Sequence, residues 1–403
     1  MALDPEELKR RRAKKKQQRN RANILRLVIA AVVAVLVAVL IIVLVSNREK
    51  PDPDATAAPA DTTVIHMAAA GDLNVTEKVI ASGGETYDYT AMMLDVAHLL
   101  ADADITALNF EGNFYGAPYG TDRSAPQSLA DALARAGVDV LQLANTYSIY
   151  KGTAGLSATI NAVKLAGMEP LGVYATAKEA KQAKGYSVRV VNGIKIAFVG
   201  FTKGMDGMAL PPGNEGCVNV LYTDYATDYQ QVDREGITKV LDAVAKEKPD
   251  LTVAMVHWGS DFNDNISKSQ TSISKLMLEE GVDVILGTHP HYVQKMEFDP
   301  AAGTFVAYSL GDFVGDAARA GSEYSVILDL EITKNNETGE TKVTGFSNTP
   351  IFICAEEEKP VRILRIKESM TAFEEGYLEK VSQKTYDAMK YALGRIEARV
   401  AGK

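Results

Sequence analysis

The chain has 403 residues, of which 46% are hydrophobic and 24% charged, and its formal net charge is −9. This charge is divided unevenly. The first 50 residues carry twelve Lys and Arg against four Asp and Glu, so the remainder has a net charge of −17. An acidic remainder argues against nucleic acid as a partner. The two cysteines, Cys217 and Cys354, are too few for a disulfide framework, and they form either one bridge or two buried free thiols.

A basic segment and an apolar run open the chain. Residues 1–26 hold ten Lys and Arg, and Leu27–Val45 is an unbroken run of 19 apolar residues. At 1.5 Å per residue this run is about 28 Å long, enough to cross the hydrocarbon core of a bilayer. A signal peptide would end at a small-residue cleavage site, which Ser46-Asn47-Arg48 is not. We therefore predict a single-pass membrane protein with a transmembrane anchor at 27–46, residues 1–26 in the cytoplasm and the remainder outside the cell.

The next segment is typical of a linker. Residues 47–62 (NREKPDPDATAAPADT) contain three prolines and many small residues, a composition that favours an extended, flexible connection. The roughly 340 residues that follow, 63–403, are enough for one elaborated α/β domain.

Strand and helix patterns alternate along residues 63–403. The pair Asn192-Gly193 between two apolar runs predicts a hairpin. The order of elements predicts an α/β fold with a mixed β-sheet core flanked by helices. The predicted strands are 64–70, 105–110, 138–143, 168–173, 187–191, 194–200, 251–257, 282–286, 305–310, 324–332 and 342–346, and the predicted helices are 89–101, 129–136, 156–166, 228–248, 273–280 and 377–400.

The segment GTHPH at 287–291 holds two of the five histidines in the chain. It follows the apolar run 282–286, so His289 and His291 should lie at the carboxyl end of a buried strand, where open α/β sheets place their sites. Two imidazoles around a stiff proline can clamp a divalent metal ion. A solvated turn is the alternative for this motif taken alone.

Four more polar residues stand at the ends of predicted strands: Asp72, Glu111, Asn145 and His257. Each by itself is typical of an ordinary turn or cap. Together with the histidine pair they offer two carboxylates, one amide oxygen and three imidazoles, a ligand set suited to one or two Mn, Zn or Fe ions.

Six segments between Val64 and Phe313 occur in an order and spacing more specific than any one of them. They are AAAGDLNV, ALNFEGNF, LQLANTYSIYKGTAGLSATI, VAMVHWGSDFN, GVDVILGTHPHYVQ and VAYSLGDFV. Together they resemble the CapA/PgsA family of poly-γ-glutamate capsule biosynthesis proteins, whose fold is similar to that of calcineurin-like metallophosphatases. The resemblance implies that the six polar residues occupy metal-site positions and that the N-terminal anchor is a family feature. It also implies that Gln294 and Tyr308–Gly311 complete the pattern around the site.

The chain differs from the family at the positions that would carry catalysis. The family usually has Asn-Asn-His followed three residues later by Asp, whereas this chain has Asn145-Thr146-Tyr147 and then Tyr150. The resemblance implies that the missing histidine would meet a phosphoryl group. A phenol with an ordinary pKa near 10 is a poor proton shuttle at neutral pH. Asp312 likewise replaces the asparagine usual in Ser-Leu-Gly-Asn-Phe.

Three functions stay open at this point. The first is a membrane-anchored component of capsule or exopolymer synthesis, with an anionic exopolymer and other capsule-synthesis subunits as partners. The second is an active metal-dependent phosphoesterase-type hydrolase or transferase acting on a cell-envelope polymer. The third is a surface-binding domain without metal. Ligands retained beside degenerate positions Tyr147 and Tyr150 favour the first over the second.

Overall fold

The computed structural model describes residues 61–403, except 318, 357–358, 378–380 and 403. Asp61–Lys403 is one compact unit. The predicted anchor at 27–46, the basic segment and most of the predicted linker lie outside the described residues. Within the described residues, no helix has the length and apolar character needed to cross a bilayer.

The first of two β-sheets has eight strands in the order β14-β13-β12-β1-β2-β3-β4, and β11 pairs with β1 beside this path. Strands β1 to β4 are parallel to one another, whereas β12 to β14 run antiparallel to their neighbours. The sheet is therefore mixed. Its strands are β1 (Thr62–Asn74), β2 (Ile105–Glu111), β3 (Val140–Gln142), β4 (Glu169–Leu171), β11 (Asp312–Val314), β12 (Tyr324–Asn335), β13 (Thr341–Cys354) and β14 (Arg362–Arg365).

The second sheet has six strands in the order β5-β6-β7-β8-β10-β9. The predicted Asn192-Gly193 hairpin joins its antiparallel edge strand to the next, and the four central strands are parallel. Its strands are β5 (Tyr186–Val191), β6 (Ile194–Thr202), β7 (Leu251–His257), β8 (Val284–Thr288), β9 (Met296–Asp299) and β10 (Thr304–Ala307).

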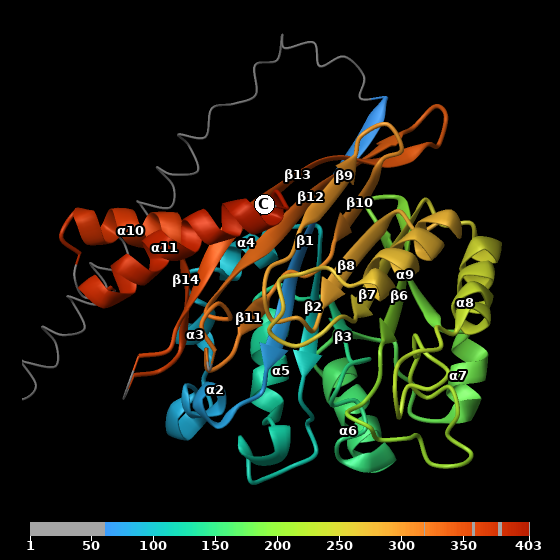
Figure 1. The fold of residues 1–403 in the computed structure, drawn as a ribbon, viewed down its shortest axis with the longest axis horizontal. Coiled ribbons are helices and arrows are strands. Elements are labelled where there is room, and N and C mark those ends of the chain that lie inside the picture. Colours follow the sequence, from blue (N-terminus) through green and yellow to red (C-terminus); the bar gives the residue numbers. More distant parts are fainter. Residues whose placement is uncertain (1–60, 318, 357–358, 378–380, 403) are drawn as a thin grey trace, which may run out of the picture. The chain divides into compact units, whose positions relative to one another are not determined.

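Apolar side chains of the two sheets meet in one buried layer, which includes Met67 of β1 and Val253 of β7. Helices α2 to α6 cover the other face of the first sheet, and α8 and α9 cover that of the second (Figure 1). The prediction of a mixed sheet core with helices outside is confirmed, and the strands are divided between two sheets. The helices are α2 (Glu77–Ala81), α3 (Thr90–Met93), α4 (Ala97–Ala101), α5 (Gln127–Arg135), α6 (Gly152–Leu165), α7 (Ala177–Ala183), α8 (Arg234–Glu247), α9 (Lys268–Glu279), α10 (Ile366–Glu374) and α11 (Gln383–Val400).

Glycines allow the chain to approach itself closely where the strands end. A Cβ added to Gly71 would stand 1.8 Å from the carbonyl oxygen of Gly311, and one added to Gly287 would stand 2.0 Å from that of Tyr308. A side chain cannot make such contacts, so only glycine fits at these two positions. The close approach of the backbone brings the residues after Gly71 in β1 and after Gly287 in β8 to the same end of the sheets.

Four aspartates fasten the opposite, amino-terminal ends of the parallel strands. Each precedes a strand, accepts a backbone N–H from the neighbouring strand with its carboxylate, and donates its own N–H to the carbonyl of that same residue. For Asp283 and Thr252 these two distances are 2.7 and 2.9 Å. The other pairs are Asp104 with His66, Asp139 with Thr106 and Asp250 with Lys195.

The Asp283 carboxyl should make stability depend on pH. Burial raises its pKa from 3.8 to about 6, although the Thr252 N–H opposes this. Because the folded pKa lies above the unfolded one, its stabilising contribution is complete below about pH 4 and is lost as the pH rises through about 6. Asp283→Asn keeps an acceptor without a charge, so it should escape this loss. Its unfolding free energy relative to the wild type should be about 3 kcal/mol more favourable at pH 8 than at pH 4.

The measurement is urea unfolding followed by the fluorescence of Trp258, which is buried and the one tryptophan in the sequence. Asp299→Asn is the matched control, because Asp299 is an exposed residue at the end of β9 that also accepts a backbone N–H. Equal pH profiles for wild type and Asp283→Asn would contradict the expectation.

Candidate metal centre

The carboxyl ends of β1 and β2 in the first sheet face those of β7 and β8 in the second. Asp72 lies near the end of β1, Glu111 and His257 are the last residues of β2 and β7, and His289 directly follows β8. All four side chains are buried. The strand-end positions predicted from the sequence therefore do converge, and they form overlapping groups of possible ligands.

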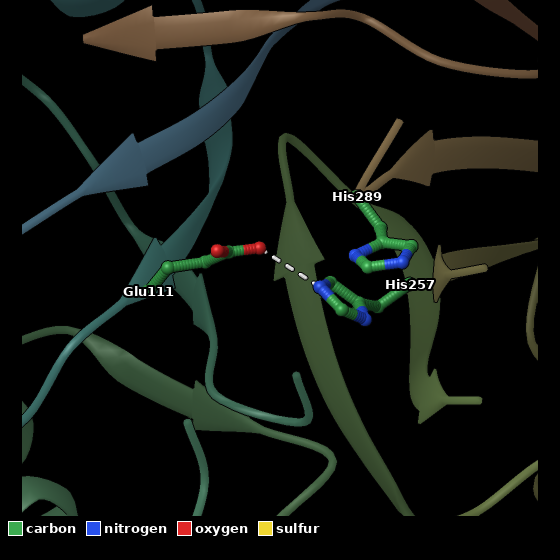
Figure 2. A group of neighbouring side chains, drawn as sticks. All are labelled: Glu111, His257 and His289. Atoms are coloured by element: carbon green, nitrogen blue, oxygen red, sulfur yellow. Dashed lines mark hydrogen bonds and ion pairs between the residues drawn. The ribbon is translucent and has the colours of Figure 1, made fainter. Parts of the chain in front are cut away.

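The first group consists of Glu111, His257 and His289, whose ligand atoms lie within 4.8 Å of one another. Figure 2 shows the carboxylate of Glu111 reaching from β2 to the second sheet, where its Oε1 lies 2.8 Å from His257 Nε2. The Nδ1 atom of His257 lies 3.2 Å from the hydroxyl of Thr202. The His289 ring lies beside that of His257, with centroids 4.4 Å apart.

The protonation states in this group suit a metal ion. Burial lowers the pKa of His289 well below its ordinary value and also lowers that of His257. Burial opposes the charge of Glu111, but the hydrogen bond with His257 and the nearby charges of His257, His291 and Arg123 together lower the pKa of the carboxyl. Neutral imidazoles and a carboxylate are the forms that bind metals. The Nδ1 atom of His289 is buried and has no hydrogen-bond partner among the described residues, so its lone pair is available to a metal ion.

The second group consists of Asp72, His291 and Asp312. His291 Nδ1 lies 2.7 Å from Asp312 Oδ1 and 3.6 Å from Asp72 Oδ2. Burial opposes a charge on His291, but the Asp312 carboxylate raises the pKa of His291 to about 10. Burial and the carboxylate of Glu111 raise the pKa of Asp72 well above its usual range. A metal bound here would displace the proton of His291.

Two asparagines hold the carboxylates of the second group. Asn74 donates to Asp312 Oδ1 at 3.0 Å, and Asn109 donates to Asp72 Oδ1 at 2.6 Å. Asp312 was noted in the sequence as a departure from the family, but it was not predicted as a ligand. The signal that could have found it is its position just after the apolar run 305–310.

The histidine pair has an unusual backbone. His289 has φ of 91° and His291 has φ of 57°, a region that non-glycine residues rarely adopt. This conformation directs the His289 N–H to Asp72 Oδ2 at 3.0 Å. Strained backbone of this kind concentrates at functional sites, so the solvated-turn alternative for GTHPH is disfavoured.

A third group lies on the outer side of the same histidines. The carboxylate of Asp261 lies 3.3 Å from His289 Nε2 and 3.9 Å from His291 Nε2, and its side chain is 60% exposed. Asp261 and the two histidines thus form a third group of possible ligands. Asp261 was not predicted as a ligand, because it lies in a loop without a periodic pattern.

Asn145 is connected to the ligand groups through another asparagine. Its Nδ2 donates to the carbonyl oxygen of Phe110 at 2.6 Å and to Asn109 Oδ1 at 3.2 Å, and its Oδ1 accepts the N–H of Tyr147 at 3.0 Å. These partners fix the orientation of the amide and connect it through Asn109 to Asp72. Direct ligation by Asn145 stays a prediction.

The two tyrosines predicted as degenerate positions differ in their surroundings. Tyr147 is half-buried, accepts a hydrogen bond of 2.7 Å from the guanidinium of Arg123, and has a pKa that burial raises to about 12. Tyr150 is 38% exposed, and its ring meets that of Tyr147 edge-on at 5.7 Å. The phenol beside the ligand groups therefore remains protonated at any physiological pH.

Two adjacent cavities open over the ligand groups, one of about 290 Å³ and one of about 220 Å³. Both are lined by Tyr147, Asp261 and His291, and the larger also reaches Glu111 and His289. A small ligand can therefore reach the candidate metal centre.

Comparison with known proteins is consistent with the family resemblance in the sequence. Residues 66–317 match the model of the family described as "Bacterial capsule synthesis protein PGA_cap". The chain is 29% identical over 248 residues to a capsule biosynthesis protein CapA from Bacillus anthracis, covering 60% of this chain and 57% of the relative. It is 29% identical over 227 residues to a PGA biosynthesis protein CapA from Bacillus subtilis, covering 55% and 53%. The chain thus spans about half the length of these curated relatives.

Solved structures with a similar arrangement are more distant. A phosphatase from Mycoplasma pneumoniae has a TM-score of 0.43 at 13% identity, covering 72% of this chain and 94% of that one. A 5'-nucleotidase precursor from Thermus thermophilus has a TM-score of 0.43 at 14% identity, covering 78% and 59%. Neither similarity carries an argument about activity.

Proposed function

The chain belongs to the bacterial capsule synthesis protein family PGA_cap, and on this premise we propose that it is a membrane-anchored, CapA-like component of capsule synthesis. It acts in the synthesis, export or anchoring of poly-γ-glutamate or a related exopolymer. Its partners are the bilayer, the anionic exopolymer and other capsule-synthesis subunits.

The proposal includes a divalent metal centre with one or two ions, of Mn, Zn or Fe. The observation that carries it is the buried group of Glu111, His257 and His289, in which one imidazole nitrogen has no partner within the described part of the chain. Asp72, His291 and Asp312 would hold a second ion. When bound, such ions polarise oxygen atoms of a ligand and stabilise negative charge on them.

The enzymatic alternative needs a proton donor beside the ligands. Tyr147 is the phenol that lines both cavities, and its pKa of about 12 makes it a reluctant donor. This favours a binding or scaffolding role over phosphoester hydrolysis or transfer. The metal-free alternative is disfavoured because it leaves Nδ1 of His289 without a partner.

Metal analysis tests the proposal directly. The full chain, purified in detergent without chelator and then supplied with Mn or Zn, should retain one or two ions per chain after desalting. Binding should be lost with excess chelator and return when metal is restored. A chain that retains no ion under either condition would remove the metal centre from the proposal.

The predicted anchor has its own test. Protease added to intact cells should digest the outer domain and spare residues 1–26, because only the outer domain is accessible. Protease added to permeabilised cells is the control and should remove both. Recovery of the intact domain from the culture medium, cleaved near Asn47, would instead indicate a signal peptide.

A further inference from the structure

Lys203 places an ammonium group at the wall of the larger cavity. It follows β6 directly, its Nζ donates to the carbonyl oxygen of Gly259 at 2.9 Å, and it lies 3.4 Å from His289 Nε2. The Tyr229 ring packs against it, with the centroid 4.8 Å from Nζ. Lys203 is partly buried and forms no ion pair with a carboxylate of the described residues. Asp261, which lines the same cavity, is the carboxylate whose charge acts on this ammonium group.

Arg123 places a guanidinium group at the wall of the smaller cavity. Its Nη2 donates to the Tyr147 hydroxyl at 2.7 Å, its Nη1 to the carbonyl oxygen of Val75 at 3.4 Å, and its central carbon lies 4.3 Å from the centre of the Tyr147 ring. Like Lys203, it has no ion-pair partner in the part of the chain that the structure describes. Tyr147 and a backbone carbonyl thus hold the cation in place without neutralising it.

These two cations lie in an acidic domain. Residues 51–403 carry a net charge of −17, and partly buried cations are normally paired. Lys203 and Arg123 form no such pair among the described residues, and they face adjacent cavities that share Tyr147, Asp261 and His291. Carboxylates also line these cavities: Glu111, Asp206 and Asp261 in the larger, and Asp261, Asp312 and Asp316 in the smaller. Lys203 and Arg123 are therefore the positions among the described lining residues where an anionic group can meet a Lys or Arg charge, and ions held by the ligand groups would offset the carboxylates.

We propose that Lys203 and Arg123 form two oxyanion subsites, one in each cavity, and that the site takes a chain molecule with anionic groups on neighbouring units. One anionic group binds the ammonium of Lys203, and another binds the guanidinium of Arg123. The Tyr147 hydroxyl can donate a further hydrogen bond to the segment between them. The inference rests on the proposed function in one respect, because it assumes a metal centre next to the part of the ligand between its two anionic groups. The contacts to the anionic groups themselves are made by side chains.

The experiment measures binding of three probes to the full chain in detergent by titration calorimetry, with metal and with chelator. Inorganic phosphate reports a single subsite, whereas tripolyphosphate and a γ-linked glutamate trimer report both and distinguish phosphoryl from carboxylate ligands. Lys203→Gln and Arg123→Gln should each weaken binding of tripolyphosphate or of the glutamate trimer about tenfold, the loss expected for one charge-assisted hydrogen bond. The double variant should lose more than either one.

Lys195→Gln is the matched control, because Lys195 lies at the other end of β6 and pairs with Glu247. It should bind each probe as the wild type does. Metal content is measured on the same samples, so loss of anion binding with unchanged metal supports the subsites independently of the proposed function. Failure of the wild type to bind either chain probe, or binding by the double variant that equals the wild type, would overturn the inference.

Discussion

His289→Ala combined with His291→Ala should abolish metal binding. His289 belongs to the first and third ligand groups and His291 to the second and third, so the double variant takes a ligand from every group found among the described residues. Retained metal should fall from one or two ions per chain to none. Since an ion that binds only the folded state stabilises it, about 100-fold excess over the dissociation constant adds about 2.7 kcal/mol to the wild type. The variant should lose that gain.

The measurement is metal content after desalting, together with the melting temperature with and without added Mn or Zn. His98→Ala is the matched control, because His98 is an exposed histidine of α4 outside every ligand group. It should melt and bind metal as the wild type does. A double variant that keeps its metal would show that the histidine pair does not hold the ion.

The ends of the strands were the most predictable part of the site. The strand predicted at Leu251–His257 has the observed bounds, and the strand predicted at 105–110 ends one residue later at Glu111. Buried parallel strands are continuous apolar runs, so the first polar residue after each run marks its carboxyl end. This is why Glu111 and His257 could be selected from sequence, although they come from different sheets.

The residues that the sequence did not reveal lie where no periodic pattern exists. Asp312 begins β11, a strand of three residues that is held in place by parallel pairing with β1. Asp261 lies in the loop after β7, and Arg123 has φ of 59° in a turn. Their positions depend on long-range pairing and on local turn geometry, which short-range apolar patterns do not encode. The division into two sheets has the same cause, because a strand's pattern gives its buried faces but not its neighbours.

The exchange Tyr147→His with Tyr150→Asp should turn a weak or inactive site into a measurable phosphoesterase. The wild type is expected to show little phosphomonoesterase or phosphodiesterase turnover even when loaded with metal. Its phenol at position 147 carries no positive charge and has a pKa of about 12. An imidazole there would line both cavities beside His291 and could protonate a leaving group near neutral pH. General acid catalysis typically contributes about 10²–10⁴ in rate, so a rise of at least about tenfold is expected.

The assay is turnover of an aryl phosphate ester by the Mn-loaded full chain, with metal content measured in parallel. Tyr150→Asp alone is the control: its exposed side chain adds a carboxylate without an acid at position 147, so its rate should stay at the wild-type level. Because aryl esters have good leaving groups, a small wild-type rate fits the expectation. Fast wild-type turnover of an unactivated alkyl ester, abolished by His291→Ala, would contradict it. The metal centre would then be catalytic with its own residues, and the hydrolase or transferase alternative would replace the scaffolding role.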